Sequence, residues 1–530
     1  MKSFLKNNWP FLLILVIAAG LRLMNLGYSD YQGDEIKALF IPDPNQTRWD
    51  FLMDQRKGPV QFIITGLLAL VDPRFENQFL MRFLFALAGI LSVLFFYKLV
   101  ELHFGKRVAF YASFFFATNG FIVALSRIVQ YQPVGMLFMV LTLYFLTKAV
   151  QDENYRVKGI YYSLFSWAIA ILTHYDGIFI APFVFYLLYQ WFRTPRPEFA
   201  GKFKHFALSG LISAVALMIF YVPFALRLSQ STVDYWSARI LEEESTKLYN
   251  SRLLFTIYQP IYVLDIYTIL LVIGVLFLSA AFLVHKFGSP GLKARLPKDM
   301  GDKTFQDILF LLIWALLPLI FMEVIVFNPG THIYTYLIPG FIFLGFGVYA
   351  IDYLLHQILG ANLGRVINLV GVSAVFTFIF IESYAIYIDH SVEYPWENER
   401  FLLWTFSRPS RELHDTYHLA LFGFPYYRNW EGIEAFTSEN PVGSYSTNER
   451  RTIARFSVNL IEEEESPQAS ERYYISIANP QSFAIALNQR MQALTEMYDP
   501  VFAYDVAGEP KAEVYLVTPE IIAKLVEMGY

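Results

Sequence analysis

Two pairs of ionisable residues lie close together near the start of the chain. Asp34 and Glu35 are adjacent carboxylates that follow an apolar stretch, and Arg56 and Lys57 open the next, shorter one. A carboxylate can take a proton from a reacting hydroxyl or hold a cation, and a basic pair can hold a phosphate. The two pairs therefore predict an acid–base centre beside an anion site. The plainer alternatives are a solvated acidic dipeptide and a basic pair that anchors a helix at a membrane surface.

Further polar groups interrupt apolar runs later in the chain. His174 and Asp176 lie in a short turn between two such runs, Arg227 follows another, and His332 and Tyr334 precede a third. Ionisable groups at such positions are costly in lipid and usually functional. We expect all five residues to contact a ligand, with Arg227 approaching a phosphate from a second side. A hydrated turn, an interfacial anchor and an aromatic belt are the alternatives without a ligand.

These residues need a membrane to position them. The chain has 530 residues, of which 55% are hydrophobic and 16% charged, and apolar runs fill most of residues 9–387. Most of these runs are roughly 18–22 residues long, enough to cross about 30 Å of hydrocarbon. The net charge of −5 comes with no basic stripe, so a nucleic-acid partner is excluded. The absence of cysteine excludes disulfides, thiolate metal sites and cysteine nucleophiles.

Apolar runs that predict membrane-spanning helices number about eleven. Basic residues gather in alternate connections between these runs, which the positive-inside rule assigns to the cytoplasm. The N-terminus is therefore predicted to be cytoplasmic. The predicted spans are 9–27, 80–100, 108–126, 133–150, 160–173, 177–192, 207–224, 262–284, 305–327, 333–351 and 366–387.

The apolar stretch 59–71 is not among these spans. It is short for a span, and counting it would place the basic connections on the wrong side of the membrane. We expect it to form a re-entrant or interfacial helix inside a first outer loop, 28–79. An odd number of spans then places the C-terminal part outside. The other predicted outer connections are 127–132, 174–176, 225–261 and 328–332.

Residues 389–530 predict a soluble α/β domain, separate from a membrane domain over 1–388. Strand-like runs alternate with helical stretches in this part, which favours a largely parallel sheet. No Gly-x-Gly-x-x-Gly follows a strand, which argues against a dinucleotide cofactor. The runs are 418–423, 442–445, 473–477, 501–504 and 514–517, and the helical stretches are 480–497 and 519–528.

The membrane region resembles the GT-C superfamily of membrane glycosyltransferases, in the branch of protein O-mannosyltransferases and aminoarabinose transferases of lipid A. Asp34-Glu35 matches the acidic motif of the family's first outer loop, and Lys57-Gly58-Pro59 matches its basic-Pro-Pro motif except that Val60 replaces the second proline. The resemblance implies a GT-C fold of about eleven transmembrane helices, with the appended C-terminal domain of many prokaryotic members. Further matches are Arg82, His103-Phe104-Gly105, Ser126-Arg127 and the tyrosine-rich stretch after His332.

The resemblance also implies a reaction. A hexosyl or pentosyl group would move from a polyprenyl-phosphate carrier to a hydroxyl of a protein, lipid or glycan, with inversion and on the extracytoplasmic face of the cell membrane. Asp34 would be the base, and Glu35 would orient the acceptor. The donor would be bound by Arg56, Lys57, Arg127, His174, Asp176, Arg227, His332 and Tyr334.

No obligatory cofactor is predicted. The family often has an acidic residue shortly after the arginine matched by Arg127, but this chain has Gln130 and no carboxylate there. Asp34 and Glu35 would then hold an optional divalent cation only with help from a donor phosphate. Two other functional classes stay open, namely a transporter or flippase for a lipid-linked sugar and a membrane sensor.

Overall fold

The protein is described from a computed structural model. The structure describes residues 2–195, 197–241, 265–297, 300–326, 330–391, 422–462, 471–481, 489–506 and 508–530. The predicted strand 418–423 lies outside the described residues except for its last two positions, as do parts of the connections 225–261 and 328–332 and of the helical stretch 480–497.

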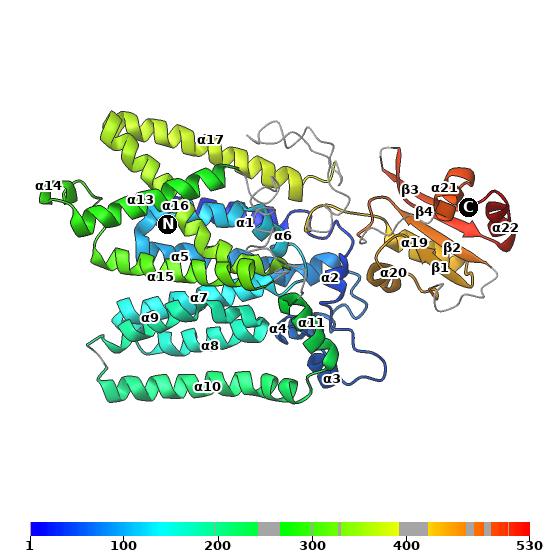
Figure 1. The fold of residues 1–530 in the computed structure, drawn as a ribbon, viewed down its shortest axis with the longest axis horizontal. Helices are drawn as coiled ribbons and strands as arrows, with labels where there is room; N and C mark the ends of the chain where they lie inside the picture. Colours follow the sequence, from blue (N-terminus) through cyan, green and yellow to red (C-terminus); the bar gives the residue numbers. More distant parts are fainter. Residues whose placement is uncertain are drawn as a thin grey trace.

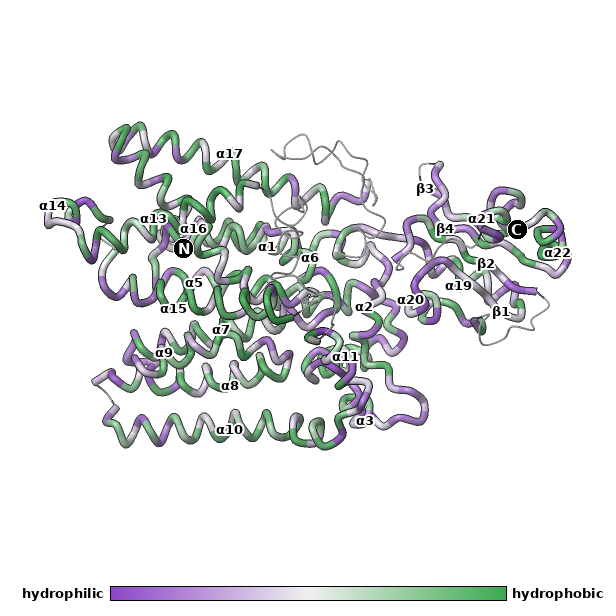
Figure 2. Tube along the Cα trace, viewed as in Figure 1, coloured by the Kyte–Doolittle hydropathy of each residue, from purple (hydrophilic) through white to green (hydrophobic). Residues whose placement is uncertain are grey.

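Long helices that run nearly parallel to one another form a membrane bundle (Figure 1). They are hydrophobic along most of their length, while hydrophilic residues gather at the bundle ends (Figure 2). Fully buried aromatic side chains such as Phe96, Phe115 and Phe116 fill the interior. The helices are α1 (Lys2–Leu23), α5 (Gln78–Thr118), α7 (Gln132–Gln151), α8 (Lys158–Thr173), α9 (Ala181–Phe192), α10 (Phe199–Leu226), α13 (Asp265–Phe287), α15 (Asp302–Ile320), α16 (Tyr334–Leu359) and α17 (Ala361–Tyr387).

In its described residues, each predicted span is mostly helical. Seven helical stretches in the described part of the chain are long and apolar enough to cross a membrane, which makes the protein a multi-pass membrane protein. Helix α5 contains two predicted spans, and Gly105 interrupts it with a φ of 79°, a backbone conformation that favours glycine. The number of crossings, eleven, stays a prediction.

Short elements of the predicted outer loops gather at the bundle end that faces the C-terminal domain (Figure 1). Helix α4, from the stretch predicted not to span, has nine residues, far fewer than the about 20 that a crossing requires. The elements at this end are α2 (Gly33–Ile36), α3 (Arg48–Met53), α4 (Val60–Leu68), α6 (Gly120–Ser126), α11 (Gln230–Leu241) and the 3₁₀ turns η2 (Tyr175–Ile180) and η4 (Gly330–Ile333). The remaining short elements are η1 (Glu153–Tyr155), α14 (Pro290–Lys293) and the π-helical turn η3 (Phe321–Ile325).

The C-terminal domain contains a mixed sheet with the strand order β1-β2-β4-β3. Among the four strands of the described residues, β1 and β2 pair in parallel while β4 runs antiparallel to both β2 and β3, so the expectation of a largely parallel sheet was wrong. The reason lies in the chain between β3 and β4, which is too short for a parallel crossover and long enough only for a hairpin. The elements are α19 (Trp430–Glu439), β1 (Ser444–Thr447), α20 (Arg451–Ser457), β2 (Arg472–Ile477), α21 (Gln489–Met497), β3 (Phe502–Val506), β4 (Glu509–Val517) and α22 (Pro519–Glu527).

Hydrogen bonds and apolar contacts join the C-terminal domain to the first outer loop. Asp30 donates its backbone N–H to the carbonyl of Tyr426 at 3.0 Å, and its carboxylate accepts the N–H of Arg428 at 2.5 Å. Tyr31 and Ile453 belong to one buried apolar cluster that both parts share. The domain and the loop therefore fold against each other as one unit.

Candidate active site

The two carboxylates of the acidic motif point in different directions. The Asp34 side chain is 57% exposed, whereas that of Glu35 is 1% exposed. Glu35 accepts two hydrogen bonds of 2.8 Å from the Arg82 guanidinium and two of 2.9 Å from the backbone N–H groups of Gln32 and Val129. These four bonds occupy both carboxylate oxygens, so Glu35 holds the loop, and its predicted role in orienting the acceptor stays a prediction.

Arg82 and Arg127 lie in the bundle and donate hydrogen bonds to the same region. Both side chains are almost fully buried. Arg82 also donates to the carbonyls of Leu26, Ser29 and Asp30, at 2.9–3.1 Å. Arg127 donates to the carbonyls of Leu21, Met24, Asn25 and Gly423, at 2.9–3.3 Å. The contacts of Arg127 thus join the end of α1 to the C-terminal domain, and its predicted role in substrate binding stays a prediction.

The C-terminal domain reaches Asp34 through Arg450. The Arg450 guanidinium lies 2.9 Å from the Asp34 carboxylate. Gly33 makes room for it, because a Cβ at that position would lie 2.7 Å from the Arg450 side chain. Burial alone would raise the pKa of Asp34, but Arg450, followed by Lys57 and Lys37, holds it below its usual value. Asp34 is therefore an ionised carboxylate among cations.

Lys57 lies close to Asp34, and the side-chain amide of Gln130 links the two residues. Gln130 donates to the backbone carbonyl of Asp34 at 2.5 Å and accepts from the Lys57 ammonium at 3.0 Å. The ammonium also lies 5.2 Å from the centre of the Tyr131 ring. The first outer loop packs tightly here, because a Cβ on Gly58 would lie 1.8 Å from a carbonyl oxygen at the end of α8. Lys57 is thereby held beside the turn that carries His174.

The surroundings of Lys57 contain more positive than negative charge. Burial lowers the pKa of Lys57 to about 8, Asp34 opposes this shift, and Lys37 and Arg239 add to it. Arg239, near the end of α11, and Arg56 both lie over the ring of Tyr235, at 4.7 and 4.3 Å. This cluster of cations suits a phosphate group.

Sequence reasoning missed Arg450, Lys37 and Arg239. Arg450 comes from another domain and carries no local signal. Arg239 had one usable signal, its position four residues after Tyr235 on a helix of a predicted outer connection. Arg227, which was predicted to share a phosphate with Lys57, forms an ion pair of 2.6 Å with Asp50 of α3.

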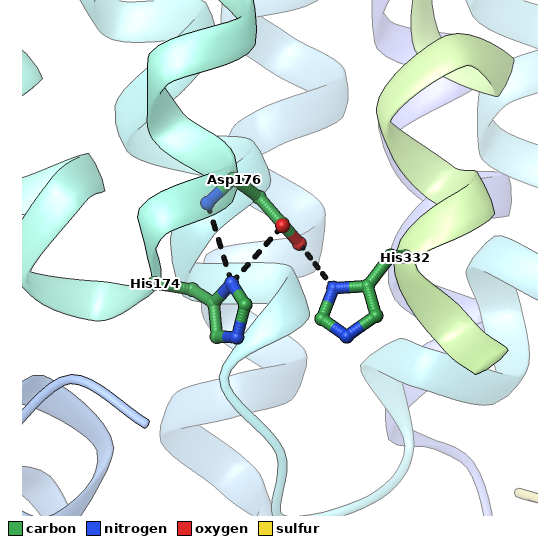
Figure 3. A group of neighbouring side chains, drawn as sticks. All are labelled: His174, Asp176 and His332. Atoms are coloured by element: carbon green, nitrogen blue, oxygen red, sulfur yellow. Dashed lines mark hydrogen bonds and ion pairs between the residues drawn. The ribbon is translucent and has the colours of Figure 1, made fainter. Parts of the chain in front are cut away.

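His174, Asp176 and His332 meet from two separate turns (Figure 3). Helix α8 ends at Thr173 because His174 adopts an extended conformation, and the His174 ring then accepts the backbone N–H of Asp176 at 3.3 Å. Nδ1 of His174 lies 3.1 Å from Oδ1 of Asp176, and Nδ1 of His332 lies 2.7 Å from Oδ2. Tyr334 lies beside them, fully buried.

This cluster adjoins the lysine site through Tyr131. The Tyr131 ring stacks on His174 with a centroid distance of 4.3 Å, and its hydroxyl lies 3.3 Å from Nδ1 of His332. The structure thus brings Asp34, Lys57 and the two histidines to one end of the bundle. Among the described residues, His174, Asp176 and His332 form the group with the side chains and spacing to hold a metal ion.

Comparisons with known proteins agree with this architecture. Residues 57–224 match the sequence model of the family described as dolichyl-phosphate-mannose-protein mannosyltransferase. A comparison with curated protein sequences found no match.

Solved structures of other proteins also match this chain. ArnT from Cupriavidus metallidurans bound to undecaprenyl phosphate matches with a TM-score of 0.50 and 11% identity, over 95% of this chain and 96% of that one. Its apo form gives 0.47 and 12%, over 99% of both chains. The oligosaccharyltransferase AglB from Archaeoglobus fulgidus, with an inhibitory peptide and dolichol-phosphate, gives 0.46 and 12%, over 72% of this chain and 56% of that one. This chain therefore spans about half of AglB. The fold is similar to that of ArnT, and residues 57–224 match the mannosyltransferase family model, so the predicted resemblance to the ArnT and protein O-mannosyltransferase branch of the GT-C superfamily is confirmed.

Proposed function

We propose that this protein is a glycosyltransferase that moves a sugar from a polyprenyl-phosphate carrier to an acceptor hydroxyl on the extracytoplasmic face of the cell membrane. The observation that carries the proposal is the position of Asp34 beside Lys57 and Lys37, with Arg239 close to Lys57. A carboxylate base next to several cations suits a reaction that removes a proton and releases a phosphate. The GT-C fold supports the same reaction class.

The proposed step is a single displacement with inversion. The acceptor oxygen forms a bond to the anomeric carbon while its proton passes to a carboxylate oxygen of Asp34. The bond between that carbon and the carrier phosphate breaks, and polyprenyl phosphate leaves with the electron pair. Lys57 and Arg239 would stabilise the charge that develops on the leaving phosphate.

The remaining residues would prepare these groups. Glu35 and Arg82 fix the turn that presents Asp34, so we now assign Glu35 a positioning role and not the orientation of the acceptor. Gln130 would keep Lys57 at a constant distance from the base. Arg450 would be displaced from Asp34, wholly or in part, when the acceptor hydroxyl binds.

Release of the free carrier tests the proposal. Purified protein is incubated with a labelled polyprenyl-phosphate sugar and candidate acceptors, and free polyprenyl phosphate is measured. We expect release from the wild type and from Asp43→Asn, an exposed control in the same loop. Asp34→Asn should bind the donor but release the carrier roughly 10²–10⁴-fold more slowly. A transporter or sensor would bind the donor without releasing its phosphate, and normal release by Asp34→Asn would rule out Asp34 as the base.

A further inference from the structure

We propose that His174, Asp176 and His332 bind a divalent transition-metal ion, and that Zn²⁺ fits them best. The three side chains are all buried, and the ligand atoms that they offer lie within 4.8 Å of one another. This inference concerns metal binding alone and stands independently of the proposed transfer reaction.

The spacing of the ligand atoms suits a small ion. Zinc lies about 2.0–2.2 Å from imidazole nitrogen and carboxylate oxygen, so neighbouring ligands of a tetrahedral site are roughly 3.3 Å apart. The two distances in this cluster that join an imidazole to the carboxylate are 3.1 and 2.7 Å. The imidazole–carboxylate distances are thus within a few tenths of an ångström of those in a zinc site, and the two imidazole nitrogens lie within 4.8 Å of each other and would move closer when the ion binds.

The hydrogen bonds within the cluster leave one carboxylate oxygen unsatisfied. Nδ1 of His174 faces the backbone N–H of Asp176 as an acceptor, so its ring proton belongs on Nε2. Oδ1 of Asp176 is buried and lies 3.1 Å from the same nitrogen, which offers it no hydrogen when the ring proton is on Nε2. Two acceptor atoms thus face each other in a buried place, which costs free energy unless a cation lies between them. A metal ion bound to Oδ1 and to Nδ1, in place of the backbone N–H at that nitrogen, would remove that cost.

The ligand types and their surroundings favour zinc over harder ions. Two imidazoles and one carboxylate suit Zn²⁺, whereas Mg²⁺ and Ca²⁺ prefer oxygen ligands. Tyr131 stacks on His174 and approaches His332 with its hydroxyl, so it restrains both rings. Three protein ligands would leave one coordination position open. The ion would tie the turn after α8 to the turn before α16.

Metal content is the direct test. The full chain is purified in detergent with a tag that contains no histidine, supplied with Zn²⁺, dialysed against metal-free buffer and analysed by elemental mass spectrometry. We expect about one zinc ion per chain. His174→Ala and His332→Ala should each lower the zinc content at least about tenfold. His285→Ala is the matched control, because His285 pairs with Asp302 in a different part of the chain and should leave the zinc content unchanged.

One more variant and one more probe distinguish loss of a metal ligand from loss of the folded structure. Asp176→Asn has nearly the same size as the wild-type side chain and should also lose zinc. After the metal is removed with a chelator, added Co²⁺ should give the visible absorption of a four-coordinate ion in the wild type and in His285→Ala only. A wild type that retains neither ion would overturn the proposal, and the cluster would then be a network of hydrogen bonds. Zinc retained at wild-type levels in all three variants would overturn it too, because the ion would be bound elsewhere.

Discussion

The buried pair of Glu35 and Arg82 should be essential for the structure of the first outer loop. In Glu35→Gln, one oxygen and one NH₂ group would face four N–H donors, so at least one donor would lose its acceptor and the Arg82 charge would lose its counterion. Breaking a buried ion pair by removing one partner typically costs about 3–5 kcal/mol. The side chains are 1% and 3% exposed, so water cannot replace the lost partner. We expect a loss of stability in this range.

Thermal unfolding and hydrogen exchange of the loop would measure this loss. The matched control is Glu76→Gln, which removes a carboxylate of the same loop from an exposed pair with Arg74 and should change stability little. Glu35→Gln should unfold at a clearly lower temperature, and amides of residues 28–39 should exchange faster. If Glu35→Gln were as stable and as well protected as Glu76→Gln and yet inactive, our reasoning would be refuted, and Glu35 would take part in the chemistry.

Three further predictions concern charge around the loop. Arg450→Ala should raise the pKa of Asp34, so the acid limb of the pH profile for carrier release should move to higher pH, and Arg450→Lys should restore it. Lys57→Ala and Arg239→Ala should each weaken donor binding by about 1.5–3 kcal/mol in a titration with the donor, and unchanged affinity in both would place the phosphate elsewhere. Burial raises the pKa of Glu449 from 4.5 to about 7, so the folded protein binds the proton more tightly than the unfolded chain. Wild-type stability should therefore fall as the pH rises from 4.5 through about 7, and thermal unfolding of Glu449→Gln should lack that part of the pH dependence.

Composition and periodicity predict the membrane part of the fold well. Hydrophobic runs of the right length mark the helices, since lipid leaves the chain few alternatives. The short stretch that forms α4 was also separated from the spans by its length, and its helix has nine residues. The C-terminal sheet was predicted less well, because strand direction depends on how β3 and β4 connect and not on the composition of either strand.

Adjacent residues of a motif need not share a role. Asp34 and Glu35 lie in the short helix α2, where successive side chains point about 100° apart. One carboxylate therefore faces the loop surface and the other faces Arg82 in the interior. Sequence reasoning treated the two as a possible cation site, because two adjacent letters do not show that a helix turns their side chains in different directions.

Partners that are distant in the chain were beyond sequence reasoning for a different reason. Arg450 is separated from Asp34 by most of the protein, and only the docking of the C-terminal domain brings them together. Arg227 and Arg239 lie in one connection, and the spacing of Arg239 from Tyr235 does not by itself say which of the two arginines approaches Lys57. The path of α11 decides this. Arg239 of this helix lies over the ring of Tyr235 and close to Lys57, whereas Arg227 forms an ion pair with Asp50.

Gln130 shows how a departure from a family pattern can fit the site. A carboxylate at this position could accept from Lys57, but it could not donate to the Asp34 carbonyl, which receives the Gln130 amide at 2.5 Å. It would also neutralise the Lys57 charge, and the site would attract a phosphate less strongly. A neutral amide links the two groups and leaves that charge intact. The glutamine that counted against a metal site at Asp34 therefore supports an anion site at Lys57.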